Sequence, residues 1–313
     1  MPHRPSPLSH PQSAARRRPH GGRAAVCAGV LVATLATLLS AGTLHPAAAA
    51  TASARPDAAP AATALAQRDA GTARFLALVK PQRKARVTAA VLDLDGTDRK
   101  PTVYGDDTPY DTASIVKVNI LAAALLQAQD AGRGLTKQER SHAEAMIERS
   151  DNAAANALWR RIGLASGLDA ANRRLGLTST KGGPGAKWGL TRTTASDQIR
   201  LLRTVFPTDP ASPAGSTALN ETSRTCIRTL MTRIVGEQAW GVSAASGSGW
   251  ALKNGWLQRS STGLWDINSV GQVTVSGHHY LVAVLSDGNT SMKDGVSLVE
   301  RAARAAVSMA TAH

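Results

Sequence analysis

A serine and a lysine stand three residues apart where an apolar segment begins, and this spacing suits nucleophilic chemistry. Residues at i and i+3 are neighbours on one helix face, so the Lys117 amine can reach the Ser114 hydroxyl. A serine hydroxyl needs a nearby base to become a nucleophile. Burial among Ile115, Val118 and Ile120 would lower the pKa of Lys117 and let it act as that base. The pair alone equally fits a serine helix cap followed by a lysine that extends to solvent.

Two later tripeptides add groups of the same chemical kind. Residues 150–152 are Ser-Asp-Asn at a predicted helix boundary, and residues 253–255 are Lys-Asn-Gly on a predicted strand. A hydroxyl and an amine can pass a proton, and a lysine can bind a carboxylate. Taken singly, the first tripeptide fits a helix cap and the second a solvated strand end. The order of all three segments favours a shared site.

The three segments, in this order, resemble the S-x-x-K, S-D-N and K-T-G motifs of penicillin-recognising serine enzymes. These enzymes are the class A β-lactamases and the D-alanyl-D-alanine peptidases. The resemblance spans residues 65–310. It implies an α+β fold of the β-lactamase type, with a five-stranded antiparallel sheet, flanking helices and an all-helical lobe at about residues 113–240.

The resemblance also assigns a role to each motif residue. Ser114 is the implied nucleophile, Lys117 helps to remove its proton, and Ser150 passes a proton towards the leaving nitrogen. The backbone N–H groups of Ser114 and Trp256 form the implied oxyanion hole. The implied substrate-binding residues are Asn152, Lys253, Asn254 and Gly255.

The sequence departs from the family pattern at three points. Asn254 replaces a Thr or Ser, so a hydroxyl that helps to bind a carboxylate is missing. Trp256 is bulky where most relatives have a smaller residue. The Glu of an E-x-x-L-N loop, which activates the deacylating water in class A β-lactamases, has no counterpart. Residues 182–189 read Gly-Gly-Pro-Gly-Ala-Lys-Trp-Gly in its place, and the nearest acid, Asp169, is expected at the surface.

Three functions therefore remain open. The first is a β-lactamase, or related amide hydrolase, that is acylated at Ser114 and turns over. The second is a penicillin-binding protein, peptidase or sensor that is acylated but releases the acyl group slowly, as the missing Glu suggests. The third is a non-catalytic surface module, which Asn254 and Trp256 favour. In each enzymatic case the partner is a β-lactam or a cell-wall peptide-like molecule.

A further motif, V-L-D-L-D-G-T, matches the nucleophile loop of haloacid-dehalogenase-type phosphatases, with Asp93 and Asp95 as the two acids. That chemistry requires a βαβ unit after the loop and a distant acidic pair for magnesium. Here a short polar strand follows at once. The better interpretation is a hairpin tip with Asp residues in the turn.

Other chemistry has little support in the sequence. His142 and Glu144 lack zinc-ligand partners at a suitable spacing, and His278 and His279 lie at a predicted strand turn. There is no G-x-S-x-G elbow and no glycine-rich phosphate loop. We therefore expect no metal and no cofactor.

Apolar periodicity predicts the elements that position these residues. Helix-type patterns alternate in blocks with strand-type patterns, which favours an α+β fold. The expected helices cover residues 65–78, 114–126, 136–149, 153–162, 168–175, 193–205, 221–234 and 296–309. The expected strands cover residues 86–94, 101–104, 250–257, 264–275 and 280–285, and residues 207–217 form a surface loop.

The N-terminal segment has the pattern of an export signal. Residues 1–50 combine five arginines, an uncharged apolar run and a small-residue end, so we expect a secreted or cell-surface protein. The protein is membrane-anchored only if this segment stays uncleaved. Residues 51–64 are expected to form an Ala/Pro-rich linker, and residues 65–313 the hydrolase domain. Without residues 1–50 the net charge falls from +14 to +9, with no basic aromatic stripe for nucleic acid, and we expect a monomer.

Overall fold

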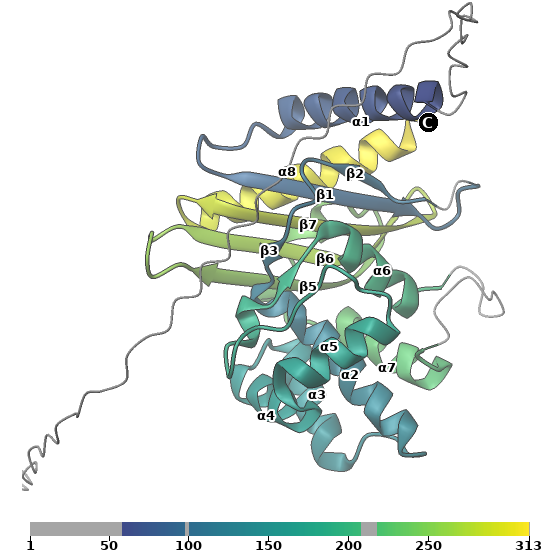
Figure 1. Ribbon diagram of the computed structural model, residues 1–313, viewed down its shortest axis with the longest axis vertical. Coiled ribbons are helices and arrows are strands. Elements are labelled where there is room, and N and C mark those ends of the chain that lie inside the picture. Colours follow the sequence, from purple (N-terminus) through teal and green to yellow (C-terminus); the bar gives the residue numbers. More distant parts are fainter. Residues whose placement is uncertain (1–57, 98–99, 208–217, 313) are drawn as a thin grey trace, which may run out of the picture. The chain divides into compact units, whose positions relative to one another are not determined.

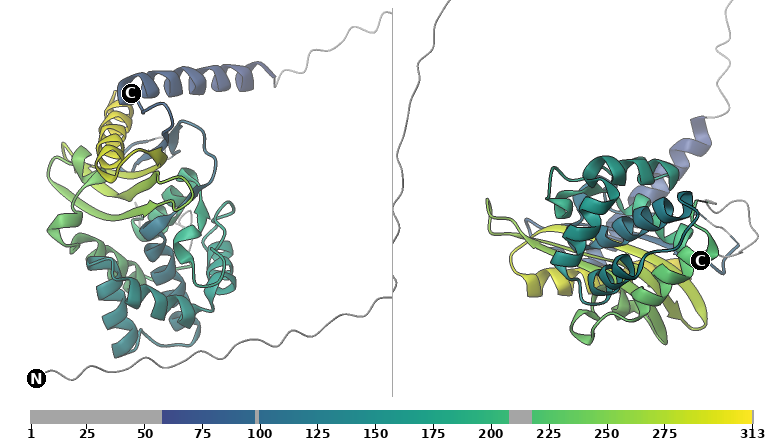
Figure 2. Two further views of the ribbon diagram at one scale, coloured as in Figure 1. Left: turned by 90° about the vertical axis from the view of Figure 1, so that its left-hand side faces the viewer. Right: turned by 90° about the horizontal axis from the view of Figure 1, so that it is seen from below.

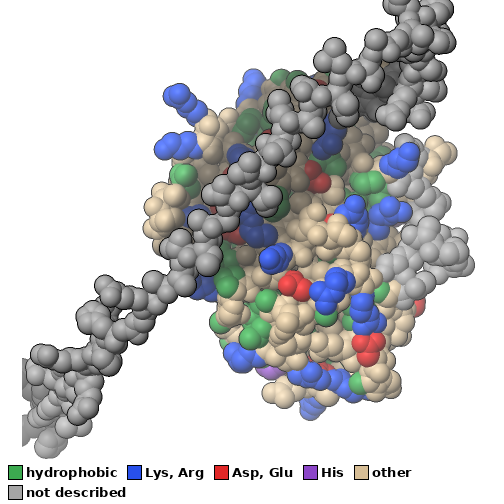
Figure 3. Space-filling model, in the orientation of Figure 1, with side chains coloured by type: hydrophobic (Ala, Val, Ile, Leu, Met, Phe, Trp, Pro, Cys, Tyr) green, Lys and Arg blue, Asp and Glu red, His purple; other side chains and the backbone are tan. Residues whose placement is uncertain are grey.

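The computed structural model describes residues 58–97, 100–207 and 218–312. The expected export segment and nearly all of the expected loop at 207–217 lie outside these ranges. None of the helices within them combines the length and the hydropathy needed to span a bilayer. On the face shown in Figure 3, lysine and arginine side chains are spread among acidic and neutral ones.

The centre of the fold is a five-stranded antiparallel sheet (Figure 1), which confirms the predicted α+β class. Its order is β2-β1-β7-β6-β5, so the strand that carries the Lys-Asn-Gly tripeptide is an edge strand. A second, two-stranded sheet joins β3 (Tyr110–Asp111) to β4 (Arg192–Thr193). The strands of the large sheet are β1 (Arg86–Asp93), β2 (Thr102–Tyr104), β5 (Gly249–Gln258), β6 (Trp265–Val275) and β7 (His278–Asn289).

Helices cover both faces of the sheet (Figures 1 and 2). Helices α1 (Ala58–Val79) and α8 (Met292–Thr311) lie on one face. The other face carries the helical lobe, which the chain forms between β3 and β5. Its helices are α2 (Val116–Asp130), α3 (Lys137–Glu148), α4 (Asn152–Ile162), α5 (Leu164–Arg174), α6 (Ala195–Val205) and α7 (Glu221–Thr232).

The hydrophobic core has two parts, one on each side of the sheet. Successive strand residues face opposite sides, and both sides of β1 are apolar. Ala90 and Leu92 contact the helical lobe, whereas Ala89 and Val91 contact the layer of α8. Almost every side chain of α2 is buried, so this helix runs through the centre of the lobe. The residues at its start are thereby fixed in place.

Local capping sets the boundaries around the Ser-Asp-Asn tripeptide. Thr136 and Glu139 form the predicted capping box at the start of α3. The carboxylate of Asp151 caps α4 by accepting a hydrogen bond from the N–H of Ala154, at 2.7 Å. Because Asp151 does the capping, the Ser150 hydroxyl is free for other contacts.

Near the N-terminal side of the sheet one sequence-based expectation is confirmed and another changes. The preferred hairpin interpretation is confirmed and the phosphatase alternative is excluded, because β1 continues into β2 as an antiparallel hairpin and not as a βαβ unit. Asp93 instead closes the turn, and its Oδ1 accepts hydrogen bonds from the N–H groups of Asp95 and Gly96 at 2.9 and 3.0 Å. Helix α1 begins at Ala58, inside the segment expected to be a linker, since alanine is the strongest helix former.

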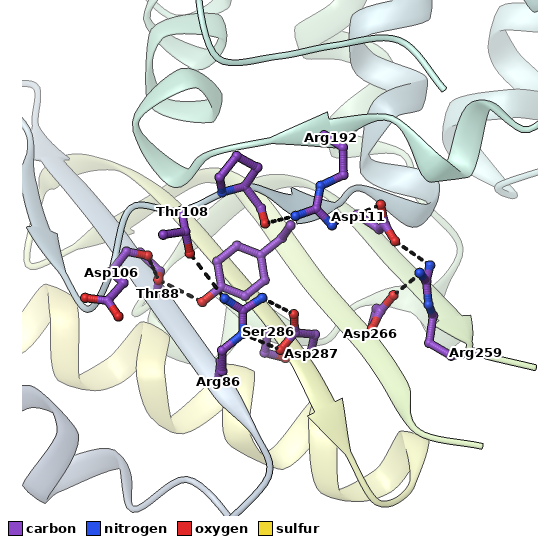
Figure 4. A network of polar contacts seen from close by, with 12 residues as sticks. Arg86, Thr88, Asp106, Thr108, Asp111, Arg192, Arg259, Asp266, Ser286 and Asp287 are labelled. Carbon is purple, nitrogen blue, oxygen red and sulfur yellow. Dashed lines mark hydrogen bonds and ion pairs between the residues drawn. The ribbon is translucent and has the colours of Figure 1, made fainter. Parts of the chain in front are cut away.

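A buried polar network fixes the chain segment that leads to Ser114 (Figure 4). The Asp111 carboxylate pairs with Arg192, at 3.4 Å, and with Arg259. Arg259 also lies 3.6 Å from the carboxylate of Asp266 on β6. The amide nitrogen of Asn268 donates to the carbonyl groups of Asp111 and Thr112 at 2.9 and 3.1 Å. The strand before the nucleophile is therefore held by both sheets.

Asp266 makes this network sensitive to pH. Burial, opposed by Arg259 and supported by Asp111, raises the pKa of Asp266 to about 7. An unfolded chain ionises this carboxyl near pH 4, so ionisation weakens the folded state as the pH rises from about 4 to about 7. Asp266→Asn removes this penalty. Its free energy of unfolding, relative to the wild type, should rise by roughly 1–3 kcal/mol between pH 5 and pH 8 in urea titrations.

Asp130→Asn is the matched control, since Asp130 forms an exposed ion pair with Arg174. Such a pair contributes about 0–1 kcal/mol, so its effect should differ little between the two pH values. A difference for Asp266→Asn that is flat or falls with pH would contradict the assignment.

Candidate active site

Ser114 lies in a tight turn between the small sheet and the central helix. The turn is a 3₁₀ helix, Ala113–Ile115, which runs directly into α2. Ala113 has a φ of 46°, in the left-handed region that non-glycine residues seldom adopt. Strain of this kind persists only where the surrounding structure imposes it, and it gathers at functional sites. The half-buried Ser114 lines a cleft of about 550 Å³.

Gly255 allows the edge strand β5 to lie directly against this turn. A Cβ atom at position 255 would lie 2.7 Å from both the Ser114 nitrogen and the Thr112 carbonyl oxygen. Real Cβ atoms do not come that close, so only glycine permits the contact. The N–H of Ser114 and the backbone of β5 near Trp256 thereby come together, as the implied oxyanion hole requires.

Lys117 is fully buried and contacts Ser150 and Asn152. Its Nζ donates to the Ser150 carbonyl at 2.7 Å, to Ser150 Oγ at 3.0 Å and to Asn152 Oδ1 at 2.8 Å. Within the described part of the chain, Ser114 Oγ makes no hydrogen bond to this amine. Burial lowers the pKa of Lys117 to about 7, with Asp151 opposing the shift. Lys117 therefore exchanges its proton near neutral pH.

Lys253 reaches the same serine from the sheet. It is fully buried on β5, and its Nζ donates to Ser150 Oγ at 3.1 Å and to the Asn254 carbonyl at 3.0 Å. Burial, and then the charge of Lys117, holds the pKa of Lys253 well below its usual range. The structure thus brings four predicted residues, Lys117, Ser150, Asn152 and Lys253, into one hydrogen-bonded chain beside Ser114.

The side chain of Asn254 lies elsewhere. Residues on a strand alternate between faces, so Asn254 faces away from the side that Lys253 and Gly255 present to the helical lobe. It is fully buried, and its amide nitrogen donates to the carbonyl groups of Gln238 and Trp240 at 2.7 and 2.9 Å. It is not among the described residues that line the cleft. The neighbouring Trp256 does line the cleft, with its ring tilted against Trp240 at 6.1 Å.

Trp188 is a cleft residue to which the sequence assigned no role. Its ring centroid lies 4.8 Å from Lys117 Nζ, which is a cation–π contact when the amine is charged. Its indole N–H donates to Asn156 Oδ1 at 2.8 Å, and Asn156 lies one helical turn after Asn152. The sequence offered one indication of this role, a tryptophan in a loop of mostly small residues. It did not indicate which side chain the tryptophan ring would cover.

The loop that carries Trp188 is anchored at several points. The indole of Trp159 donates to the Gly185 carbonyl at 2.8 Å, and the N–H of Gly183 donates to Thr191 Oγ1 at 3.0 Å. Asp169, expected at the surface, is half-buried and accepts a hydrogen bond from the N–H of Gly182 at 2.8 Å. These contacts hold the Trp188 ring over Lys117.

The cleft presents hydroxyls, amides and the amine of the exposed Lys187. Among the described residues that line it, none carries a carboxylate. The buried Lys117 and Lys253 do not line the cleft, but both contact Ser150, which does. The arrangement suits nucleophilic attack by Ser114 on the carbonyl of an anionic substrate.

Solved structures with the same fold are class A β-lactamases and penicillin-binding proteins. The chain is similar to PBP-A, with 19% identity, a TM-score of 0.64, and coverage of 78% of this chain and 97% of that one. It is similar to a class A β-lactamase from Bacteroides cellulosilyticus, with 15% identity, a TM-score of 0.64, and coverage of 79% and 99%. A β-lactamase from Chitinophaga pinensis gives 15% identity, a TM-score of 0.62, and coverage of 78% and 99%.

No curated protein matches the chain. A family model described as the beta-lactamase enzyme family matches residues 138–310, a region that includes Ser150, Asn152 and Lys253. This region is more than half of the 313 residues, and the chain belongs to the beta-lactamase enzyme family.

Proposed function

We propose that this protein is a serine acyl-transfer enzyme that β-lactams or D-alanyl peptide-like amides acylate at Ser114, and that releases the acyl group slowly. The carrying observation is the Trp188 ring over Lys117, beside a cleft whose described lining residues include no carboxylate. A structure of a PBP-A variant is an acyl-enzyme complex with penicillin G, and this supports the substrate class.

The acylation step follows from the contacts of Lys117. A neutral Lys117 accepts the proton of Ser114 Oγ as the oxygen attacks the carbonyl carbon, once the substrate closes the site. The N–H groups of Ser114 and Trp256 stabilise the oxyanion, each by about 3 kcal/mol. Ser150 Oγ, in contact with both buried lysines, delivers its proton to the leaving nitrogen and receives in its place the proton that Lys117 took from Ser114. The C–N bond breaks, and the acyl group remains on Ser114.

Release of the acyl group needs a water molecule that attacks the acyl carbon, and a base that takes a proton from this water. The Trp188 ring lines this cleft, lies over the buried Lys117 and is held there by Asn156. An aromatic ring offers neither a proton acceptor nor space for water. We therefore expect a long-lived acyl-enzyme. Efficient β-lactam hydrolysis is the competing function, favoured by the fold shared with class A β-lactamases.

Ser114→Ala tests the nucleophile. Excess benzylpenicillin should add the mass of one intact drug molecule to the wild-type chain, because the ring opens without losing atoms, and nothing to the variant. Intact mass spectrometry followed by peptide mapping locates the adduct. Ser166→Ala, which changes an exposed serine on α5, is the matched control and should label like the wild type. Equal labelling of Ser114→Ala would reject this nucleophile.

The Lys117 pKa of about 7 predicts how the acylation rate depends on pH. The neutral amine is the active form, so the rate constant should rise about tenfold per pH unit below pH 6 and level off above pH 8. Lys117→Met should lower the rate by roughly 10²–10⁴-fold and remove the pH dependence. Stopped reactions read by mass spectrometry give the rate, with Lys181→Met as the control. A wild-type rate that stays constant from pH 5.5 to 8.5 would exclude Lys117 as the base.

Trp188→Glu tests the cause of slow release. A carboxylate at this position would stand near Lys117 and can activate water, so the adduct lifetime should fall at least tenfold. Trp188→Phe is the matched control, because it keeps an aromatic ring over the amine and should leave the lifetime within about twofold of wild type. Decay of the adduct after removal of free drug provides the measurement. Rapid decay in the wild type would favour the β-lactamase function instead.

A further inference from the structure

Two carboxylates and an imidazole lie close together at the end of β1, and they take no part in the proposed acyl-transfer site. The donor atoms of Asp93, Asp95 and His278 all lie within 4.8 Å of one another. Asp93 ends β1, Asp95 follows it in the turn, and His278 begins β7. The group thus joins two turns that are far apart in the sequence.

Backbone pairing between β1 and β7 holds these turns together. Asp93 is the cross-strand partner of Tyr280, and the N–H of Leu94 donates to the His279 carbonyl at 2.8 Å. Asp93 and His278 therefore extend from the ends of two paired strands, and Asp95 extends from the turn that follows β1. Only rotation of the side chains is needed to bring their donor atoms closer.

Each of the three side chains is oriented by a neighbour. Asp93 Oδ1 accepts from the two N–H groups of its turn, the carboxylate also accepts from the Tyr280 hydroxyl, and Oδ2 lies 3.8 Å from His278 Nδ1. That separation is too long for a hydrogen bond. The His278 ring stacks on Tyr280, with centroids 6.4 Å apart. Asp95 Oδ2 accepts from the N–H and ring nitrogen of His279, at 2.7 and 3.0 Å.

We propose that Asp93, Asp95 and His278 form a binding site for a divalent transition-metal ion, with Zn²⁺ as the best match. Zinc binds imidazole nitrogen and carboxylate oxygen at about 2.0–2.2 Å, in a tetrahedron whose donors are about 3.3 Å apart. Three protein ligands leave one position for water. Calcium and magnesium prefer more ligands, all of them oxygen, and so do not match a site with an imidazole.

His279 has a supporting role in this site. Its contacts with Asp95 resemble the hydrogen bonds that usually orient a metal-binding carboxylate. The site is separate from Ser114. Gly255, beside Ser114, aligns across β6 and β7 with Thr88 on β1, and Asp93 lies five residues further along that strand. Five strand residues span about 17 Å, so zinc binding is independent of the proposed acylation.

Calorimetric titration of the untagged full chain with Zn²⁺ at pH 7.5 tests the site. The wild type should bind one Zn²⁺ that both His278→Gln and Asp93→Asn bind at least tenfold more weakly. Asn at position 93 retains an oxygen that can close the turn, so this variant should fold. His142→Gln is the matched control and should keep wild-type affinity, because His142 lies on α3 away from the group. The N-terminal histidines are present in every variant and cancel in the comparison.

The change in Tm on adding Zn²⁺ tests the same three metal-binding residues by a second method. Zn²⁺ should raise the Tm of the wild type and of His142→Gln, and leave the Tm of the two site variants nearly unchanged. Labelling of Ser114 by benzylpenicillin should be the same with and without Zn²⁺. Wild-type Zn²⁺ affinity in both His278→Gln and Asp93→Asn, or a wild type that binds no more tightly than they do, would overturn the proposal.

Discussion

Two buried amines that share one serine hydroxyl are the constraint on which the active site depends. Lys117 and Lys253 both contact Ser150 Oγ, and none of the described residues that line the adjacent cleft carries a carboxylate. Burial disfavours the charged form of Lys117 and lowers its pKa to about 7, so its neutral amine becomes accessible near physiological pH. The helical lobe supplies Lys117 and Ser150, and the sheet supplies Lys253. The lobe and the sheet must therefore pack closely for the site to have any base at all.

In the proposed function, the loop over the cleft controls how long the acyl group stays on Ser114. Its anchors on α4 and α5 place an indole ring, and not a carboxylate, over Lys117. The same fold occurs in class A β-lactamases and in PBP-A, and a fold alone does not determine function. In the proposed function, Trp188 is the side chain that slows release of the acyl group.

Much of the fold was predictable because it is encoded locally. Apolar spacing located the strands and helices, and the Thr136 and Glu139 pair predicted its cap. The family resemblance of the motifs at Ser114, Ser150 and Lys253 predicted that these residues would lie together in one site. The contact of Trp188 with Lys117 was not predictable, because it depends on how a loop of small residues folds back over α4. Asn254 was assigned to the substrate, yet strand alternation turns its side chain towards Gln238 and Trp240. The pairing of Asp93 with His278 depends on the register of two strands distant in sequence.

The contact between β5 and the turn at Ser114 has a consequence for the divergence of this fold. It is made by backbone atoms, and at position 255 it requires only that no side chain be present. Such a contact tolerates replacement of nearly every surrounding side chain, provided that the strand and the turn keep their paths. The fold itself is shared with solved structures at 15–19% identity. In this chain the position of Ser114 is set by main-chain atoms, so side chains around it can change without moving it.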